Sequence, residues 1–493
     1  MKRILLGVAA GLAAAACGPG AEAPRATLVL QNCRLPGVEA IARCAKHEVF
    51  EDREAQAGRR IRINIAVVPA RNRAHEPDPV VVFAGGPGQG AVSLAAQVMP
   101  LFSRLNDLRD IVFIDQRGTG ASHPLSCEPD EPQKLQALFE DAMPERLVRQ
   151  CLEQLEADPK LYVTPLAIAD LEEIRQGLGY EKLNLWGGSY GTRVALEYLR
   201  RHGSHVRTVT LDGAAPATMK LPLSFVTDGE TALKRMLDAC DAQVLCRSTY
   251  PELRATIAAL RSRLSRRPER TSIQDPRTGS RETIQVNENV LLSGMFRPLY
   301  VAEMASLLPL GLAAAAAGDF SPLLAPNLEF ASDISENLAV GMHLSVICAE
   351  DIARVTRQDL EVLDASFFGH ALVDDFVRAC AFWPRGKLPA DYYDPVTSDV
   401  PTLILSGGID PATPPRHGDA VAKTLKNARH LVAPHLGHGV SLHGCAPRLI
   451  ESFIRKADAA AVDGSCLQRI PRPLFALPLG VMRDAAPPRE KKK

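Results

Sequence analysis

The fold is decided by the stretch LNLWGGSYG, residues 183–191. Its apolar start predicts a buried strand, and the residues after it predict a helix that carries Val194, Leu196 and Leu199. Between strand and helix lies G-x-S-x-G, the pattern of a nucleophile elbow, a tight turn that exposes a nucleophilic serine. The flanking glycines matter because side chains there would collide with the neighbouring strand and helix. We therefore predict that Ser189 is a catalytic nucleophile.

Short β-rich runs alternate with helical stretches from about Ile61 onward, and no solenoid or propeller repeat is present. Ile168, Leu171, Ile174 and Leu178 recur at helical spacing and predict the helix before the elbow strand. The alternation predicts an α/β fold, with a mostly parallel sheet and helices on both faces. The expected strands are residues 61–68, 80–83, 111–114, 183–186, 206–211, 402–405 and 429–432.

Asp410 and His438 have the positions expected of an acid and a base. A serine hydroxyl is a poor nucleophile until a base takes its proton, and an acid orients that base. Asp410 follows one expected strand in SGGIDP, and His438 follows the next in LGHG. The chain order Ser, Asp, His, with the acid and base on loops beyond core strands, indicates an α/β-hydrolase fold.

The sequence GGPG, residues 85–88, follows an expected strand where this fold supplies an oxyanion hole. A tetrahedral intermediate needs N–H donors that are held in place before reaction. We expect the N–H groups of Gly86 and Tyr190 to be these donors. The alternative, a phosphate loop over residues 85–90, lacks the Gly-Lys-Ser/Thr that should follow it.

Strand alternation disappears from about Pro216 to Asp399 and gives way to helical segments and a polar stretch at residues 266–281. This change predicts an inserted, mainly helical cap domain. The apolar run 307–317 is short and contains proline and glycine, so it predicts a buried cap helix and not a membrane span. The expected divisions are residues 1–25 for a leader and linker, 26–215 for the first part of the core, 216–399 for the cap, 400–483 for the second part of the core and 484–493 for a disordered tail.

The N-terminus has the layout of a secretory signal. Lys2 and Arg3 precede an apolar stretch at residues 4–16, which is too short to span a membrane as a mature helix. The alanines before Cys17 resemble a bacterial lipobox, although its usual leucine is replaced by Ala14. We expect an exported protein, periplasmic or anchored to the membrane through Cys17; ordinary signal-peptidase cleavage and secretion is the alternative.

The chain has 11 cysteines, an odd number for an oxidising compartment. Removing Cys17 as a lipid anchor leaves an even set that can pair. We expect pairing between neighbours in sequence, because short loops close at low entropic cost, while a mixture of buried free thiols is the alternative. The expected disulfides are Cys33 with Cys44, Cys127 with Cys151, Cys240 with Cys246, Cys348 with Cys380, and Cys445 with Cys466.

Charge balance and ligand spacing speak to two kinds of partner, nucleic acid and a metal ion. The 493 residues contain 57 Lys+Arg and 57 Asp+Glu, so there is no charge excess to suggest nucleic acid as a partner. His435, His438, His443 and Cys445 resemble zinc ligands, but their spacing fits no common site. We therefore expect neither a metal nor a cofactor.

Four motifs in order resemble the prolyl-aminopeptidase-like and tripeptidyl-aminopeptidase-like serine peptidases of the α/β-hydrolase fold. They are residues 85–88, DQRGTGAS at 115–122, residues 187–192, and a block from Pro401 through DPATPP at 410–415 to Gly437-His438-Gly439 and Cys445. The resemblance covers most of the chain after the leader. One departure is Ala84, where the family often has histidine, which changes the support expected for the glycine loop. Residues 115–122 are expected to form a structural turn beside the site.

The resemblance implies an exopeptidase whose cap offers a carboxylate to the free α-amino group of a peptide. Glu350, in CAED at residues 348–351, matches the family segment that carries such a glutamate, and a solvated carboxylate at a helix start is the alternative. The implied function is an aminopeptidase that forms an acyl-enzyme on Ser189. Two other functions stay open: an esterase or lipase with the same triad, and an inert hydrolase-like surface binding protein.

Overall fold

The structure is a computed structural model that describes residues 28–127, 135–140, 143–275 and 278–478. Cys17 and the tail 484–493 lie outside the described residues. No helix in these ranges combines the length and the apolarity needed to cross a membrane.

The core is a nine-stranded sheet in the order β1-β2-β3-β5-β4-β6-β7-β10-β11. The strands from β5 to β11 run parallel, whereas β1, β2 and β3 pair antiparallel at one edge. This is the mostly parallel sheet that the sequence predicted. The strands are β1 (Gln31–Cys33), β2 (Ala42–Phe50), β3 (Arg60–Val68), β4 (Val80–Phe83), β5 (Ile111–Ile114), β6 (Leu183–Gly188), β7 (Val206–Asp212), β10 (Thr402–Gly407) and β11 (Ala428–Ala433).

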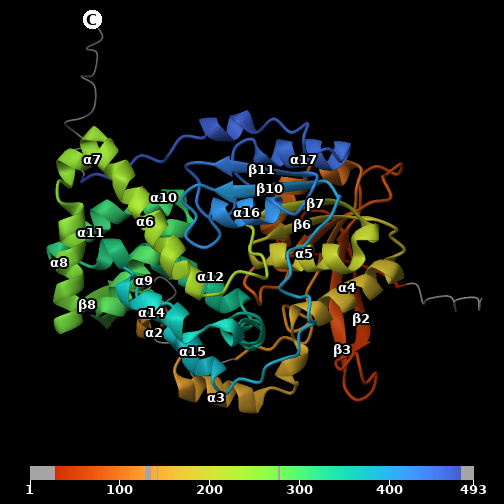
Figure 1. Ribbon diagram of the computed structural model, residues 1–493, viewed down its shortest axis with the longest axis horizontal. Helices are drawn as coiled ribbons and strands as arrows, with labels where there is room; N and C mark the ends of the chain where they lie inside the picture. The colour runs from red at the N-terminus through yellow and green to blue at the C-terminus, as the bar shows by residue number, and fades with distance from the viewer. Residues whose placement is uncertain (1–27, 128–134, 141–142, 276–277, 479–493) are drawn as a thin grey trace, which may run out of the picture.

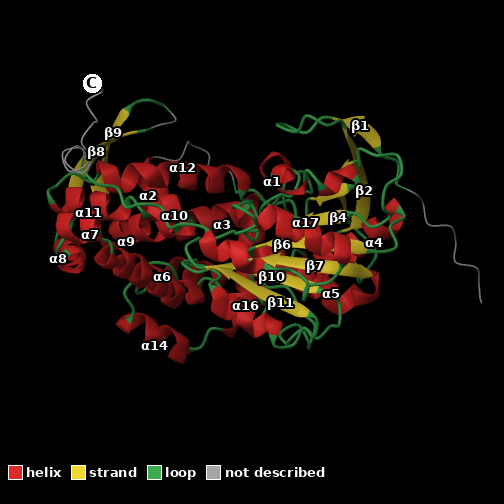
Figure 2. Ribbon diagram, turned by 90° about the horizontal axis from the view of Figure 1, so that it is seen from above, coloured by secondary structure: helices red, strands yellow, loops and turns green. Residues whose placement is uncertain are grey.

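Helices cover both faces of the sheet (Figure 2). Side chains of a strand point alternately to the two faces, so Val81 and Phe83 pack under one set of helices and Val80 and Val82 under the other. The first face is covered by α4 (Thr164–Leu178) and α5 (Tyr190–His202). The second is covered by α1 (Ala95–Phe102) and α17 (Ala446–Lys456). α16 (Pro415–Ala422) connects β10 to β11.

The seven expected strands are all present, but β1 and β2 were missed. β2 lies beside β1 near the sheet edge and buries only part of its residues, and it contains Arg43, Lys46 and Glu48. Its sequence therefore lacks the continuous apolar run that marks a strand buried on both faces.

Between β7 and β10 the chain builds a separate helical layer beside the sheet (Figure 1). The expected buried helix at residues 307–317 is α11. The polar stretch at 266–281, expected without strands, contributes to a two-stranded hairpin, β8 with β9. The elements of this layer are α6 (Leu223–Ala242), α7 (Val244–Thr249), α8 (Leu253–Arg266), β8 (Glu269–Gln274), β9 (Arg281–Val286), α9 (Glu288–Phe296), α10 (Ala302–Ala305), α11 (Leu308–Ala316), α12 (Ser321–Asn337), α13 (Val340–Val346), α14 (Arg357–Ala365) and α15 (Asp374–Cys380).

Two helices from the first part of the chain pack on this cap layer. In α2 (Leu135–Glu140), Leu135 and Leu138 belong to the apolar core of the cap. The second helix, α3 (Glu145–Gln154), lies against α15 and contributes Val148 to the same apolar cluster as cap residues. The cap therefore includes a segment that precedes the elbow, in addition to the insertion after β7.

All five disulfides expected from the sequence are present: Cys33–Cys44, Cys127–Cys151, Cys240–Cys246, Cys348–Cys380 and Cys445–Cys466. Each closes a short stretch of chain, with sequence separations from 6 to 32 residues. Because Cys445 is bonded to Cys466, its thiol is not free to join His435, His438 and His443 around a metal ion.

Candidate active site

Ser189 occupies the turn between β6 and α5 with φ 55° and ψ −125°, a conformation that non-glycine residues rarely adopt. The turn tolerates no side chain on its neighbours. A Cβ on Gly187 would lie 2.3 Å from the Gly191 carbonyl oxygen, and one on Gly191 would lie 2.2 Å from that of Phe83. The two flanking glycines are therefore required for this turn to pack between strand and helix.

Asp410 and His438 are in direct contact. Nδ1 of His438 lies 2.8 Å from a carboxylate oxygen of Asp410, which is buried. The backbone N–H groups of Ala412 and Thr413 also donate to Asp410, at 2.8 and 2.9 Å. Burial acts to raise the pKa of Asp410, but His438 and these donors outweigh it and lower the pKa. Asp410 is therefore a carboxylate suited to orient the imidazole.

Thr413 is a third member of this contact that the sequence analysis did not single out. Its hydroxyl donates to Asp410 at 2.8 Å and lies 3.1 Å from Nδ1 of His438. It belongs to the DPATPP block, three residues after the acid. The hydroxyl occupies one oxygen of Asp410 and thereby limits the orientations open to the carboxylate.

The end of β7 brings His438 to the elbow. The N–H of Ser189 donates to the carbonyl of Asp212 at 2.9 Å, and a Cβ on the next residue, Gly213, would lie 3.3 Å from Cε1 of His438. The buried carboxylate of Asp212 accepts the N–H groups of Val440 and Ser441, just beyond the histidine. One strand end thus holds both the serine turn and the histidine loop.

The surroundings of His438 change its acidity. Burial acts to lower its pKa, but the carboxylates of Asp410 and Asp212 outweigh burial and raise the pKa above its ordinary value. A base with a raised pKa is a stronger proton acceptor, although it becomes neutral only at higher pH.

The glycine loop lies against the elbow, as the oxyanion-hole prediction requires. A Cβ on Gly85 would lie 3.3 Å from Cβ of Ser189. Tyr190 is the first residue of α5, and N–H groups at a helix start have no acceptor within the helix. The two expected donors therefore lie close to the serine. Tyr190 follows Ser189 in the chain, and Gly86 follows Gly85, which packs against Ser189.

Cap residues support this glycine loop. They do so next to Ala84, which stands where the family often has a histidine. The imidazole Nδ1 of His343, on α13, lies 2.8 Å from the carbonyl oxygen of Pro87. The N–H of Ala339 donates to the carbonyl of Gly88 at 3.0 Å. The sequence analysis missed both residues, because they stand about 250 positions away along the chain.

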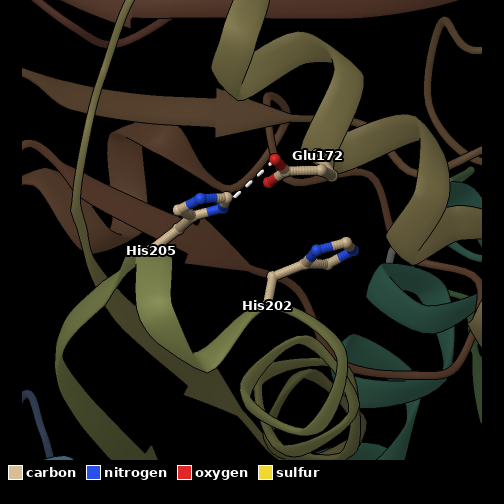
Figure 3. Close-up of side chains that lie close together, drawn as sticks. All are labelled: Glu172, His202 and His205. Carbon is tan, nitrogen blue, oxygen red and sulfur yellow. Dashed lines mark ion pairs between the residues drawn. The ribbon is translucent and has the colours of Figure 1, made fainter. Parts of the chain in front are cut away.

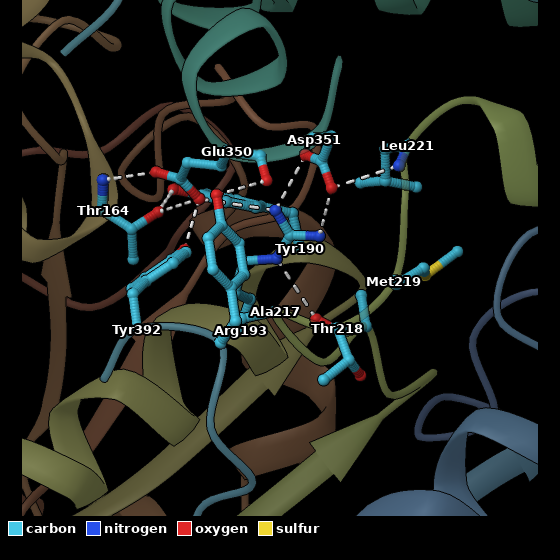
Figure 4. Close-up of polar contacts among 12 residues, drawn as sticks. Thr164, Tyr190, Arg193, Ala217, Thr218, Met219, Leu221, Glu350, Asp351 and Tyr392 are labelled. Atoms are coloured by element: carbon cyan, nitrogen blue, oxygen red, sulfur yellow. Dashed lines mark hydrogen bonds and ion pairs between the residues drawn. The ribbon is translucent and has the colours of Figure 1, made fainter. Parts of the chain in front are cut away.

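Glu350 is placed differently from its prediction. Its side chain is fully buried in a π-helical turn, Ile347–Asp351, and both carboxylate oxygens are engaged (Figure 4). One oxygen accepts the N–H of Thr164 at 2.8 Å; the other accepts the hydroxyls of Thr164 and Tyr392 and lies 3.4 Å from Arg193. The geometry does not support direct contact between Glu350 and a substrate amine, because neither oxygen is exposed.

Glu350 and its neighbour Asp351 instead tie the cap to the elbow helix. Arg193, on α5, donates to Asp351 at 2.9 and 3.1 Å, and the Thr164 hydroxyl that touches Glu350 also lies 2.7 Å from the phenol of Tyr190. Burial raises the pKa of Glu350, and Arg193 opposes this effect. The first turn of α5 is thus held by two carboxylates from the cap (Figure 4).

The turn at residues 115–122 is held by hydrogen bonds and ion pairs to neighbouring segments of the chain. Asp115 accepts the N–H groups of Val92 and Ala121 and the amide of Asn64. Arg117 is fully buried and donates to Asp170 at 2.6 and 2.9 Å. These contacts agree with the structural role expected for the motif.

Comparison with known proteins identifies two families. Residues 78–283 match the family described as alpha/beta hydrolase fold, and residues 365–466 match the TAP-like protein family. The chain is 25% identical over 387 residues to the serine protease Hip1 of Mycobacterium tuberculosis, covering 71% of this chain and 73% of that protein.

Two further relatives, matched over shorter stretches, are also named as peptidases. A tripeptidyl aminopeptidase of Streptomyces lividans is 27% identical over 210 residues, 39% of each chain. A proline iminopeptidase of Neisseria gonorrhoeae is 30% identical over 135 residues, 27% of this chain and 32% of that one. The chain spans less than half of the length of these two relatives.

The fold and the family matches together define the chain as an α/β-hydrolase. Within that class it is a serine hydrolase with a TAP-like C-terminal region, related to aminopeptidases.

Proposed function

We propose that the protein is an exported aminopeptidase that releases one or a few residues from a free peptide N-terminus. Ser189 is the nucleophile, His438 the general base and Asp410 the orienting acid. The observation that carries the proposal is the 2.8 Å contact between Asp410 and His438. This pair lies next to the C-terminal end of β7, where the carbonyl of Asp212 accepts the N–H of Ser189.

In the proposed reaction Nε2 of His438 takes the proton of the Ser189 hydroxyl, and Oγ attacks the scissile carbonyl. The N–H groups of Gly86 and Tyr190 stabilise the oxyanion. The intermediate then collapses to an acyl-enzyme when His438 returns the proton to the leaving amine. Water, deprotonated by the same histidine, hydrolyses the ester and regenerates Ser189.

The preference for a peptide with a free N-terminus is supported by the relatives, two of which are named as aminopeptidase and iminopeptidase. A protonated α-amine is generally recognised through charge-assisted hydrogen bonds to a carboxylate that the substrate can reach. Glu350 is not included in this part of the proposal, because its carboxylate is buried and bonded on both oxygens.

Export is supported by the five disulfides, since such bonds persist in oxidising compartments. We propose that the predicted leader directs the protein out of the cytoplasm and that Cys17 carries a lipid anchor. Mass spectrometry of the protein recovered from its native membrane fraction tests this. A diacylated N-terminal Cys17 is expected, whereas an N-terminus at another residue contradicts the anchor.

A panel of chromogenic peptides tests the activity. Substrates with one, two or three residues and a free amine are compared with the same peptides acetylated at the N-terminus. We expect acetylation to reduce kcat/KM by at least about tenfold, because a charge-assisted contact is lost. Equal turnover of both forms, with efficient hydrolysis of simple esters, would instead indicate an esterase.

The nucleophile is tested separately by labelling with a fluorophosphonate probe, which reacts only with an activated serine. Ser189→Ala should abolish labelling, and Ser262→Ala, at an exposed cap position, should not change it. An unlabelled wild-type protein would favour an inert binding protein, and labelling that persists in Ser189→Ala would show that another serine reacts.

A further inference from the structure

A group of three potential metal ligands lies outside the active site, on the face of the sheet covered by α4 and α5. Glu172 comes from α4, His202 is the last residue of α5, and His205 stands in the short 3₁₀ turn Gly203–His205 that leads into β7. One ligand atom from each side chain lies within 4.8 Å of the other two (Figure 3). We propose that these three residues form a binding site for a zinc ion.

The spacing of two of these atoms fits a single zinc ion. Nδ1 of His205 lies 3.2 Å from a carboxylate oxygen of Glu172. Zinc binds histidine nitrogen and carboxylate oxygen at about 2.0–2.1 Å, so two ligands of a tetrahedral ion are separated by about 3.3 Å. The two atoms therefore stand where adjacent corners of such a tetrahedron would lie.

The contact between these two atoms, drawn as an ion pair in Figure 3, does not have the geometry of a hydrogen bond. Nδ1 of His205 is shielded from solvent and has no hydrogen-bond partner in the described part of the chain, although the carboxylate oxygen is close. A polar atom that is shielded from solvent and makes no hydrogen bond is costly and calls for an explanation. The oxygen, Oε1, already accepts hydrogen bonds from Arg175 and Gln176, so a cation between the two atoms would supply the partner that the nitrogen lacks.

The carboxylate is already held in position by its neighbours. Arg175 donates to both oxygens of Glu172, at 2.7 and 2.9 Å, and Tyr198 and Gln176 donate at 2.7 and 2.8 Å. Such outer contacts orient a metal ligand. The guanidinium of Arg175 also repels a dication, so we expect a micromolar site and not a tighter one.

The imidazole of His202 completes the set. Its ring lies almost parallel to that of His205, with an angle of 6° and 6.3 Å between centroids, and it packs on Tyr198. Two imidazoles and one carboxylate are ligands that suit zinc, and water fills the fourth position. The sequence predicted no metal here, because Glu172 stands far from both histidines along the chain.

The site is structural and not catalytic. His202 ends the same helix that Tyr190 begins, so it stands about 18 Å from the serine turn along the helix axis. A bound ion would join α4 to the connection between α5 and β7. We therefore expect zinc to stabilise the fold and to leave basal peptide hydrolysis unchanged.

Zinc titration of the full protein, stripped with a chelator and held at about pH 7.5, above the ordinary pKa of a free imidazole, tests the proposal. Calorimetry should give one ion per chain with a micromolar Kd. At about 100-fold excess over Kd, the Tm should rise by about 3 °C. His202→Ala and His205→Ala should each weaken binding at least about tenfold.

His370→Ala is the matched control. That histidine also contacts two carboxylates, those of Asp364 and Asp374, but it lies on the exposed surface and its ring nitrogens are hydrogen-bonded. Zinc binding should be unchanged in this variant. The proposal is overturned if the wild-type protein takes up no zinc, if both histidine variants bind like wild type, or if His370→Ala abolishes binding.

Discussion

The backbone N–H of His438 donates to the carbonyl of Tyr300 at 2.7 Å. Tyr300 ends a short turn in the cap, Arg297–Tyr300, and its ring also meets the imidazole edge to face at 5.2 Å between centroids. The candidate base is therefore positioned partly by the inserted layer and not by the sheet alone. Movement of the cap would displace His438 together with the glycine loop that His343 supports.

Gly437→Ala is expected to remove activity by disturbing this contact. A Cβ on Gly437 would lie 2.2 Å from the Tyr300 carbonyl oxygen and 2.8 Å from its carbon, and neither is a flexible atom. The loop must shift, and small displacements of a catalytic group cost about 100-fold in rate. We expect at least that loss of kcat/KM. Gly203→Ala, whose Cβ would meet only Leu199 at 3.8 Å, is the control that should stay active.

The pH profile should reflect the raised pKa of His438. The base acts only when it is neutral, so kcat/KM should rise with pH and level off above the pKa of the free enzyme. Because Asp410 and Asp212 raise that pKa above 6.5, the half-maximal pH should lie above 6.5. Measurement of kcat/KM across pH checks this. A profile that is half-maximal below pH 6.5 would contradict the assignment of His438 as the general base.

Asp410→Asn should lower kcat by about 10⁴-fold, because the amide no longer stabilises the imidazolium or the correct tautomer. It should also shift the acid limb of any residual activity to lower pH, since one of the two carboxylates that raise the pKa of His438 is gone. A residual profile that keeps the wild-type midpoint would contradict the role of Asp410.

Glu350→Gln separates the buried role from direct amine recognition. The substitution removes the charge that faces Arg193 and leaves the hydroxyls and N–H around it imperfectly satisfied, so we expect a loss of about 2–4 kcal/mol in the free energy of unfolding. Denaturant unfolding measures this loss. KM should rise no more for free-amine substrates than for acetylated ones. A selective increase for the free amines would restore the amine-binding role, and Glu303→Gln, exposed in the cap, is the control.

Loss of the Cys348–Cys380 disulfide should destabilise the protein more than loss of Cys240–Cys246. The two bonds span 32 and 6 residues, and the chain-entropy relation assigns them about 3.7 and 2.2 kcal/mol. Paired alanine variants compared by denaturant midpoint check the order. Equal or reversed losses would show that unfolded-chain entropy is not the main contribution.

Local sequence was sufficient for much of the protein. The elbow, the strands buried on both faces and the loops that carry Asp410 and His438 are contiguous patterns, and each depends on backbone geometry that a few residues determine. The five disulfides followed from the spacing of the cysteines because each pair is close along the chain. β2 was missed because a partly exposed strand near the sheet edge has no continuous apolar run.

The sequence by itself determined the α/β-hydrolase class and the serine, acid and base that we propose for it. Only the tertiary structure decided that Glu350 is buried with both oxygens bonded, and which cap residues contact the glycine loop and His438. It also decided that Glu172 meets His202 and His205. A carboxylate in a motif looks the same whether it faces substrate or is buried against an arginine, because burial and partners come from segments far away in the chain. That information exists only once the cap has packed on the sheet.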